Sequence, residues 1–290
     1  MAEAYHQGAE DAAEKPIPVQ FLSYEEQREK TYVLLTEEAR RIRWRLNGPL
    51  STAVSVMEHW QIDPDNAVFE PYHTNDGETG PAGSWHPLSQ SPYTTPKVSS
   101  INIAVEALDE WINYWLERHE EHYFERAKPR FGPLPEDDSK TVVTTEERED
   151  GRFREACCGT DRPVNKTADL VVKATGDFIT IHDFLSAVHP YLMDRRADIV
   201  AAMREDQYRG NPVPAEDGLF VDPAYASPDF LSLSDEKEWL KSHRHRDYKV
   251  VNDAATQARL QSYEPKLRAH REQVMKYLAE RRAAERAAAG

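Results

Sequence analysis

Residues 169–203 read DLVVKATGDFITIHDFLSAVHPYLMDRRADIVAAM. The apolar run at 169–174 predicts a short strand, and the glycine and aspartate that follow it predict a turn. Thr180 precedes Asp183 at the spacing of a capping box, so we expect a helix to begin here. Apolar residues at helical spacing continue from this point, and Pro190 predicts that the helix is kinked or divided in two.

The same order of strand and helix is predicted once before, at 98–105 and 106–125. Two further helices are expected, one that begins after an N-cap at Ser23 and runs to Leu46, and one at 50–61. The two strands would be able to pair beneath the helices, and a parallel pairing is one option. The sequence therefore predicts a mainly α fold with a minor β component (α+β): a helical body with two or three short strands, long Pro/Gly loops and a helical C-terminal extension.

Composition along the chain divides it into three parts. Residues 1–20 are rich in alanine and glutamate without an apolar period, which predicts a disordered tail. Residues 21–233 are expected to form a single globular body, with long loops at 63–97 and 127–168 where proline, glycine or charged residues interrupt the periodicity. Residues 234–290 are expected to form a basic helical extension.

Overall charge and the N-terminal sequence restrict the class of protein. The 290 residues carry a net charge of −15, which opposes the neutralisation of phosphates on which nucleic-acid binding depends. The sequence shows neither a signal peptide nor an apolar stretch long enough to cross a membrane. The only two cysteines, Cys157 and Cys158, are adjacent, which does not suit a disulfide framework. We therefore expect a soluble cytoplasmic or nuclear protein with reduced thiols and no nucleic-acid or membrane partner.

Charge is distributed unevenly between the body and the extension. Residues 235–290 contain 13 Lys and Arg against 9 Asp and Glu, so the remainder of the chain is strongly acidic. One interpretation is that the basic helices of the extension lie on the acidic body. The other is that they bind an external acidic partner, which would be another protein.

Histidines on the predicted helix after Thr180 are the leading candidates for chemistry. His182, Ser186 and His189 are spaced four and then three residues apart, which places them along one face of a continuous helix. Histidine suits proton transfer near neutral pH, and Asp183 is a candidate to orient one of the rings. The competing interpretation is that His182 is partly exposed in the first turn and that His189 makes a structural hydrogen bond.

Aromatic and imidazole side chains also occur together in the predicted loop at 63–97. Tyr72 with His73 and Trp85 with His86 form two such pairs. A loop of this kind can close over a ligand pocket and present polar tips to it, so these four residues are candidates for ligand binding. The simpler interpretation is that the aromatic rings anchor the loop to the body.

Metal binding and cofactors are not predicted. His119 and His122 are three residues apart, whereas the helical zinc-hydrolase motif needs a spacing of four. Cys157 and Cys158 lack the spacing of a zinc knuckle or a redox pair, which leaves them as structural or incidental thiols. Phosphate-binding, dinucleotide-binding and nucleophile-elbow motifs are also absent from the sequence.

The leading functional hypothesis from these features is an adaptor or scaffold-like protein that acts by protein–protein interaction, with the basic C-terminal helices as one possible contact. The alternative is a metal-independent enzyme, or a small-molecule binder, that uses His182 and His189 in a pocket covered by the 63–97 loop.

Overall fold

The described residues form a seven-stranded mixed sheet, so the predicted mainly helical fold with two or three strands is wrong. The computed structural model describes residues 20–59, 68–75, 83–120, 128–136, 142–163, 170–206, 213, 218–224 and 227–243. Of these residues, 38% are helical and 31% are in strands. The predicted N-terminal tail, except for Gln20, and the extension beyond His243 lie outside the described residues.

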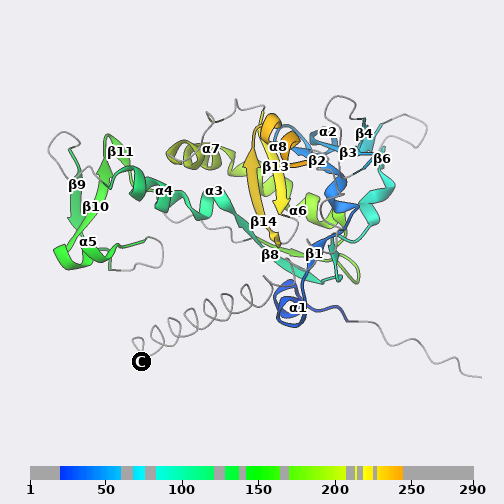
Figure 1. Cartoon of the computed structure of the whole chain (residues 1–290), viewed down its shortest axis with the longest axis horizontal. Helices are drawn as coiled ribbons and strands as arrows, with labels where there is room; N and C mark the ends of the chain where they lie inside the picture. Colours follow the sequence, from blue (N-terminus) through cyan, green and yellow to red (C-terminus); the bar gives the residue numbers. More distant parts are fainter. Residues whose placement is uncertain are drawn as a thin grey trace, which may run out of the picture. The chain divides into compact units, whose positions relative to one another are not determined.

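The sheet combines strands from distant parts of the chain (Figure 1). Only the contact between β8 and β14 is parallel, and the other five pairings are antiparallel. In spatial order the strands are β12 (Leu170–Lys173), β8 (Ser100–Val105), β14 (Ser227–Ser234), β13 (Phe220–Ala224), β2 (Ile42–Arg45), β3 (Val54–Met57) and β4 (Phe69–Pro71). The two strands predicted from sequence, β8 and β12, do pair with each other, but they run antiparallel rather than parallel.

Eight α-helices and two 3-10 helices are found among the described residues. They are α1 (Tyr24–Lys30), η1 (Ala39–Arg41), α2 (Leu50–Ala53), η2 (Pro87–Gln90), α3 (Glu106–Asp109), α4 (Trp111–Arg118), α5 (Thr145–Asp150), α6 (Ile181–Asp194), α7 (Arg196–Glu205) and α8 (Glu236–His243). The helix starts at Ser23 and Thr180 are confirmed, because both residues form complete capping boxes. Pro190 lies inside α6, and the division from α7 falls later, at Arg195.

Strands interrupt two of the predicted helices. Helix α1 stops at Lys30, and the residues that follow form β1 (Leu34–Leu35), η1 and β2. The segment at 50–61 keeps one helical turn before β3. Short apolar runs fit either a helix or a strand, and here the pairing of β2 and β3 buries Trp44 and Val56 completely, which favours the strand.

The predicted loops also contain regular structure in their described parts. Within 63–97 lie β4, β5 (His73–Thr74), β6 (Ser84–Trp85), η2 and β7 (Thr94–Thr95); β5 pairs with β6, and β7 pairs with β1. Within 127–168 lie β9 (Arg130–Pro133), α5, β10 (Arg152–Cys157) and β11 (Thr160–Asp161), which form a small sheet in the order β11-β10-β9. We call the described residues 128–136 and 142–163 the β9–β11 module, and the rest of the described chain the sheet body.

Strands β13 and β14 were missed because each contains a proline, which weakens a strand prediction. The structure accommodates Pro223 next to an irregularity in the register of the two strands. A bulge is one of the few places in a sheet where proline is tolerated, since no ladder hydrogen bond is lost there.

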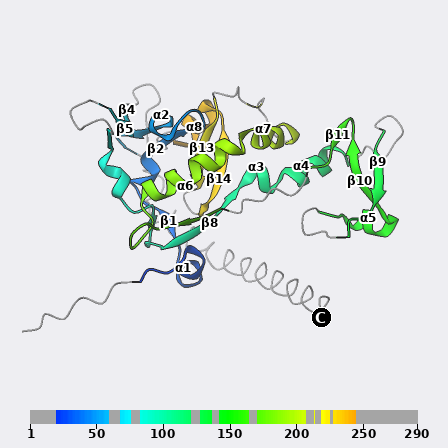
Figure 2. The ribbon, with the colours of Figure 1, turned by 180° about the vertical axis from the view of Figure 1, so that it is seen from behind.

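The two faces of the sheet are covered by different helices (Figures 1 and 2). Successive residues of a strand point to opposite faces, so Trp44 and Arg43 of β2 are separated by the sheet. On the face of Trp44, residues of α6 and α7 complete the large apolar core. On the face of Arg43, Trp239 of α8 packs against Phe220 and Met57. This contact includes α8 in the same compact unit as the sheet.

Candidate functional site

Helix α6 places the predicted residues His182 and Ser186 beside Tyr72, which lies between β4 and β5. The Nδ1 atom of His182 is 3.3 Å from the Tyr72 hydroxyl, and its Nε2 atom is 3.2 Å from the Ser186 hydroxyl. Tyr72 is fully buried, His182 is half-buried and Ser186 is exposed. The three side chains therefore form one hydrogen-bonded chain that leads from the core to the surface.

Trp85 of β6 lies against these hydrogen-bonded side chains and between two imidazole rings. Its ring centroid is 4.6 Å from that of His182 and 4.5 Å from that of His73, and Tyr72 is 5.4 Å away. Trp85 nevertheless keeps 38% of its surface exposed. We call Tyr72, His73, Trp85, His182 and Ser186 the Trp85 site.

Gly83 fixes the position of His73 within this site. Its φ angle is +65°, which side chains rarely allow, and an added Cβ atom would lie 2.5 Å from the His73 ring. The hairpin of β5 and β6 can therefore approach the imidazole this closely only with glycine at this position.

The directions of the hydrogen bonds that join Tyr72, His182 and Ser186 follow from the burial of Tyr72. Among the described residues, the His182 ring is the one hydrogen-bond partner recorded for the Tyr72 hydroxyl. A buried hydroxyl hydrogen needs an acceptor, so Tyr72 donates to Nδ1 of neutral His182. The proton of the ring then resides on Nε2, which donates to the Ser186 oxygen and leaves the Ser186 hydrogen directed to its surroundings.

Burial favours the neutral forms of His182 and Tyr72. It lowers the pKa of His182 below the usual value of 6.5, although the negative charge of Asp183 acts in the opposite direction. Burial, assisted by the charge of Asp183, raises the pKa of Tyr72. At pH 7 the exposed edge of the site therefore presents an indole, a neutral imidazole and a hydroxyl.

His189 and Asp183, the two other residues predicted for catalysis, have structural contacts instead. The Nδ1 atom of His189 accepts a hydrogen bond of 3.0 Å from the Trp44 indole, and its Nε2 atom donates to the Gly48 carbonyl at 2.9 Å. Burial lowers the pKa of His189, and the bond to Gly48 offsets this only in part. This geometry matches the structural role that was the competing interpretation for His189.

Asp183 completes the N-terminal cap of α6. Its carboxylate accepts hydrogen bonds from the Thr175 hydroxyl at 2.7 Å and from the backbone and hydroxyl of Thr180 at 2.9 and 2.8 Å. Burial acts to raise the pKa of Asp183, but these hydrogen bonds outweigh it and the pKa is lowered. The carboxylate is thus committed to the helix start and does not orient either histidine.

His86, the fourth candidate for ligand binding, also caps a helix. Its Nδ1 atom accepts from the Leu88 backbone at 3.1 Å at the start of η2, so the proton resides on Nε2, which lies 3.1 Å from a Glu70 carboxylate oxygen. The structure therefore brings together Tyr72, His73, Trp85, His182 and Ser186, and gives His86, His189 and Asp183 other partners.

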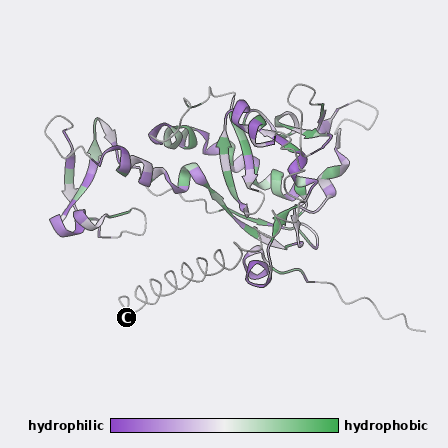
Figure 3. Ribbon diagram, viewed as in Figure 1, coloured by the Kyte–Doolittle hydropathy of each residue, from purple (hydrophilic) through white to green (hydrophobic). Residues whose placement is uncertain are grey.

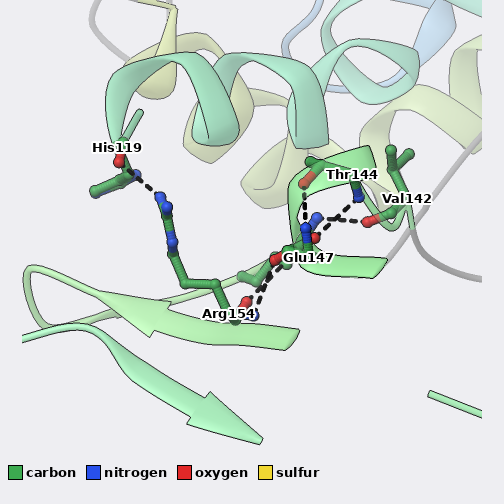
Figure 4. A network of polar contacts seen from close by, with 6 residues as sticks. His119, Val142, Thr144, Glu147 and Arg154 are labelled. Atoms are coloured by element: carbon green, nitrogen blue, oxygen red, sulfur yellow. Dashed lines mark hydrogen bonds and ion pairs between the residues drawn. The ribbon is translucent and has the colours of Figure 1, made fainter. Parts of the chain in front are cut away.

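A second polar cluster, which the sequence did not predict, joins α4 to the β9–β11 module. Figure 4 shows Arg154 directed at the end of α4, where its Nη1 atom donates to the His119 carbonyl at 2.6 Å. Glu147 of α5 accepts from the backbone of Arg154 at 2.9 Å and from Nη1 of Arg162 at 2.6 Å, and Arg162 also donates to the Val142 carbonyl.

This cluster is buried although it consists of charged groups. The side chains of Arg162 and Glu147 are 2% and 3% exposed. Burial acts to raise the pKa of Glu147, but hydrogen bonds from Arg162, Thr144 and Arg154 outweigh it and lower the pKa. From the sequence, Glu147 was expected to lie in the loop at 127–168. The sequence did contain a signal for the start of α5, because Thr144 and Glu147 have the spacing of a capping box and form that box in the structure.

Beside the cluster is a cavity of about 500 Å³, lined by Leu116, Glu117, Glu120, Thr144, Glu146, Glu147 and Arg154.

None of the helices in the described part of the chain is both long and apolar enough to cross a bilayer. No family model matches the chain, and neither the curated proteins nor the solved structures include a match to it. Function therefore has to follow from the geometry of these residues.

Proposed function

We propose that this chain acts by binding another protein, and that the exposed edge of Trp85 is the centre of the contact. The observation that carries the proposal is the position of Trp85, which remains accessible while two imidazole rings and Tyr72 hold it in place. Tryptophan and tyrosine are enriched among the residues that dominate binding energy at protein interfaces.

Rigidity of the site supports this role. Trp85 is supported by α6, which starts at a complete capping box, and by a hairpin that Gly83 holds close to His73. A side chain that is already fixed loses little conformational entropy on binding, so more of its contact energy appears as affinity. The Ser186 hydroxyl next to it supplies a hydrogen-bond donor at the rim.

The alternative of an enzyme that uses His182 as a base is supported less well. A base must accept the proton of its nucleophile, but Tyr72 occupies the lone pair at Nδ1 and directs the ring proton toward Ser186. His189, the second residue of that hypothesis, is committed to Trp44 and Gly48. The hydrogen bonds of His182 and His189 therefore favour recognition by the Trp85 site over acid–base catalysis.

Quantitative capture of partners from a native cell lysate tests the proposal with the full-length protein. We expect Trp85→Ala to reduce recovery of the specific partner about tenfold or more, as for a central interface residue, and Ser186→Ala to reduce it less. Tyr32→Ala is the matched control, since Tyr32 is an exposed aromatic residue of the same body outside the Trp85 site.

The second step is a titration of the identified partner with the purified proteins. A dissociation constant that Trp85→Ala leaves unchanged, with both variants folded by circular dichroism, would overturn the assignment of the contact to Trp85. An equal loss in Trp85→Ala and Tyr32→Ala would also count against it, because it would indicate a general effect of losing surface aromatic area.

A further inference from the structure

His119, Cys157 and Cys158 meet where α4 contacts the hairpin of β10 and β11. One potential ligand atom from each residue lies within 4.8 Å of the other two. The two sulfur atoms are 4.0 Å apart, and two thiolates bound to one tetrahedral zinc ion lie about 3.8 Å apart. From this geometry we infer that the three residues bind a thiophilic divalent cation, Zn²⁺ being the best match.

The imidazole of His119 is oriented as in a metal site. Its Nδ1 atom is 2.7 Å from the Trp115 carbonyl, and a carbonyl can only accept, so Nδ1 carries the proton. Nε2 is then the nitrogen with a lone pair, which is the form of histidine that binds metal. A backbone carbonyl on the other ring nitrogen is a common second-shell contact of zinc-bound histidine.

The hairpin brings the two adjacent thiols to the same position. Cys158 and Gly159 connect β10 to β11, and both have positive φ angles, +53° and +82°. This conformation is usual in two-residue hairpin turns but is rarely adopted by cysteine. Trp115 adds a further connection to α4, since its indole donates to the Thr160 hydroxyl at 3.3 Å.

A metal ion would also supply what the β9–β11 module lacks. Its buried residues, among those described, are Glu147, Arg154, Ala156, Cys157, Arg162 and Pro163. None of them belongs to either apolar core cluster, and Figure 3 shows α5 as strongly hydrophilic. Small units that cannot bury enough apolar surface commonly depend on a structural metal or on disulfides. Adjacent cysteines do not suit a loop-closing disulfide, which favours the metal.

Cysteine and histidine together select the kind of ion. Thiolate ligands favour zinc and other thiophilic metals over magnesium or calcium, which prefer oxygen. Two cysteines and one histidine supply three ligands, so a fourth position remains for water or another group. Each thiol must lose its proton to bind, so metal uptake should release protons and weaken as the pH falls.

The test is metal analysis of the full-length protein, purified under reducing conditions without a histidine tag. We expect close to one zinc per chain by elemental analysis. Modification of the two thiols of the wild-type protein with a mercurial should release that zinc to a chromogenic chelator. After exchange to Co²⁺, absorption from thiolate charge transfer should report coordination by sulfur.

Variants identify the ligands. His119→Ala, Cys157→Ser and Cys158→Ser should each lower zinc content severalfold, whereas His59→Ala, at an exposed histidine of the sheet body, should leave it unchanged. The mercurial release uses unaltered protein, so the test remains decisive even if a variant misfolds. Protein that holds no zinc and gives no thiolate band with added Co²⁺, or that contains a Cys157–Cys158 disulfide after reduced purification, would overturn the inference.

Discussion

The sheet body and the β9–β11 module bury opposite kinds of side chain. The interior of the sheet body is apolar and aromatic: Trp44, Phe184 and Tyr93 pack within one large cluster, and the rings of Phe184 and Tyr93 stack at 3.8 Å. The interior of the module is built around the buried pair of Glu147 and Arg162.

This contrast implies two different sources of stability. Apolar burial is nondirectional and accumulates with area, so the sheet body should unfold as one cooperative unit. A buried ion pair roughly balances its desolvation cost, yet removing one partner leaves an uncompensated charge. The module should therefore depend on correct geometry at a few atoms, and it should open without unfolding the sheet body.

The largest effect is expected from a cavity in the sheet body. Trp44→Ala removes a fully buried side chain and the indole that donates to His189, which should cost about 3–5 kcal/mol of unfolding free energy. Urea denaturation followed by circular dichroism measures it. A loss below about 1 kcal/mol would show that Trp44 is not a central part of the core.

A smaller and local effect should follow from Glu147→Ala. Loss of this carboxylate leaves Arg162 buried without its counter-charge, which should cost the module about 3 kcal/mol. Hydrogen exchange should increase in the described residues 142–163, while exchange in β2, β8 and α6 stays unchanged. Equally faster hydrogen exchange in both regions would contradict the independent opening of the module. Glu146→Ala, at an exposed neighbouring residue, is the matched control.

Gly83→Ala should disturb the Trp85 site with a modest cost to the sheet body. The added methyl group meets the His73 ring and the Thr74 carbonyl, each at 2.5 Å, at a positive φ angle, so we expect a loss of about 1–2 kcal/mol. The fluorescence of Trp85 should change, as measured against a Trp85→Phe background. Gly176→Ala, where an added Cβ meets no atom within 4 Å, is the control and should leave both properties nearly unaltered.

The smallest effect is expected from mild acid. Burial lowers the pKa of His182 and His189 in the folded state, so the unfolded chain binds more protons below pH 6.5, its usual histidine pKa. The unfolding free energy of the sheet body should therefore fall as the pH decreases from 7.5 to 5.5. Equal free energies at these two pH values in urea titrations would contradict the burial of these two rings.

Local sequence determined where several helices begin. The N-cap at Ser23 and the capping box at Thr180 were predicted correctly because their hydrogen bonds join residues only three positions apart. Strands β8 and β12 were likewise predictable from short β-branched runs. His182 and Ser186 were recognised as neighbours for the same reason, since one helical turn separates them.

Tertiary structure decided the rest, because the outcome depended on residues far away in the chain. The residues of β2 and β3 include apolar side chains that fit a helix or a strand, and pairing with β13 and β4 selected the strand. The contact of Tyr72 with His182 and the meeting of His119 with Cys157 likewise join segments that no local pattern connects. Sequence supplied the chemical groups of both sites, but only the fold placed them within bonding distance.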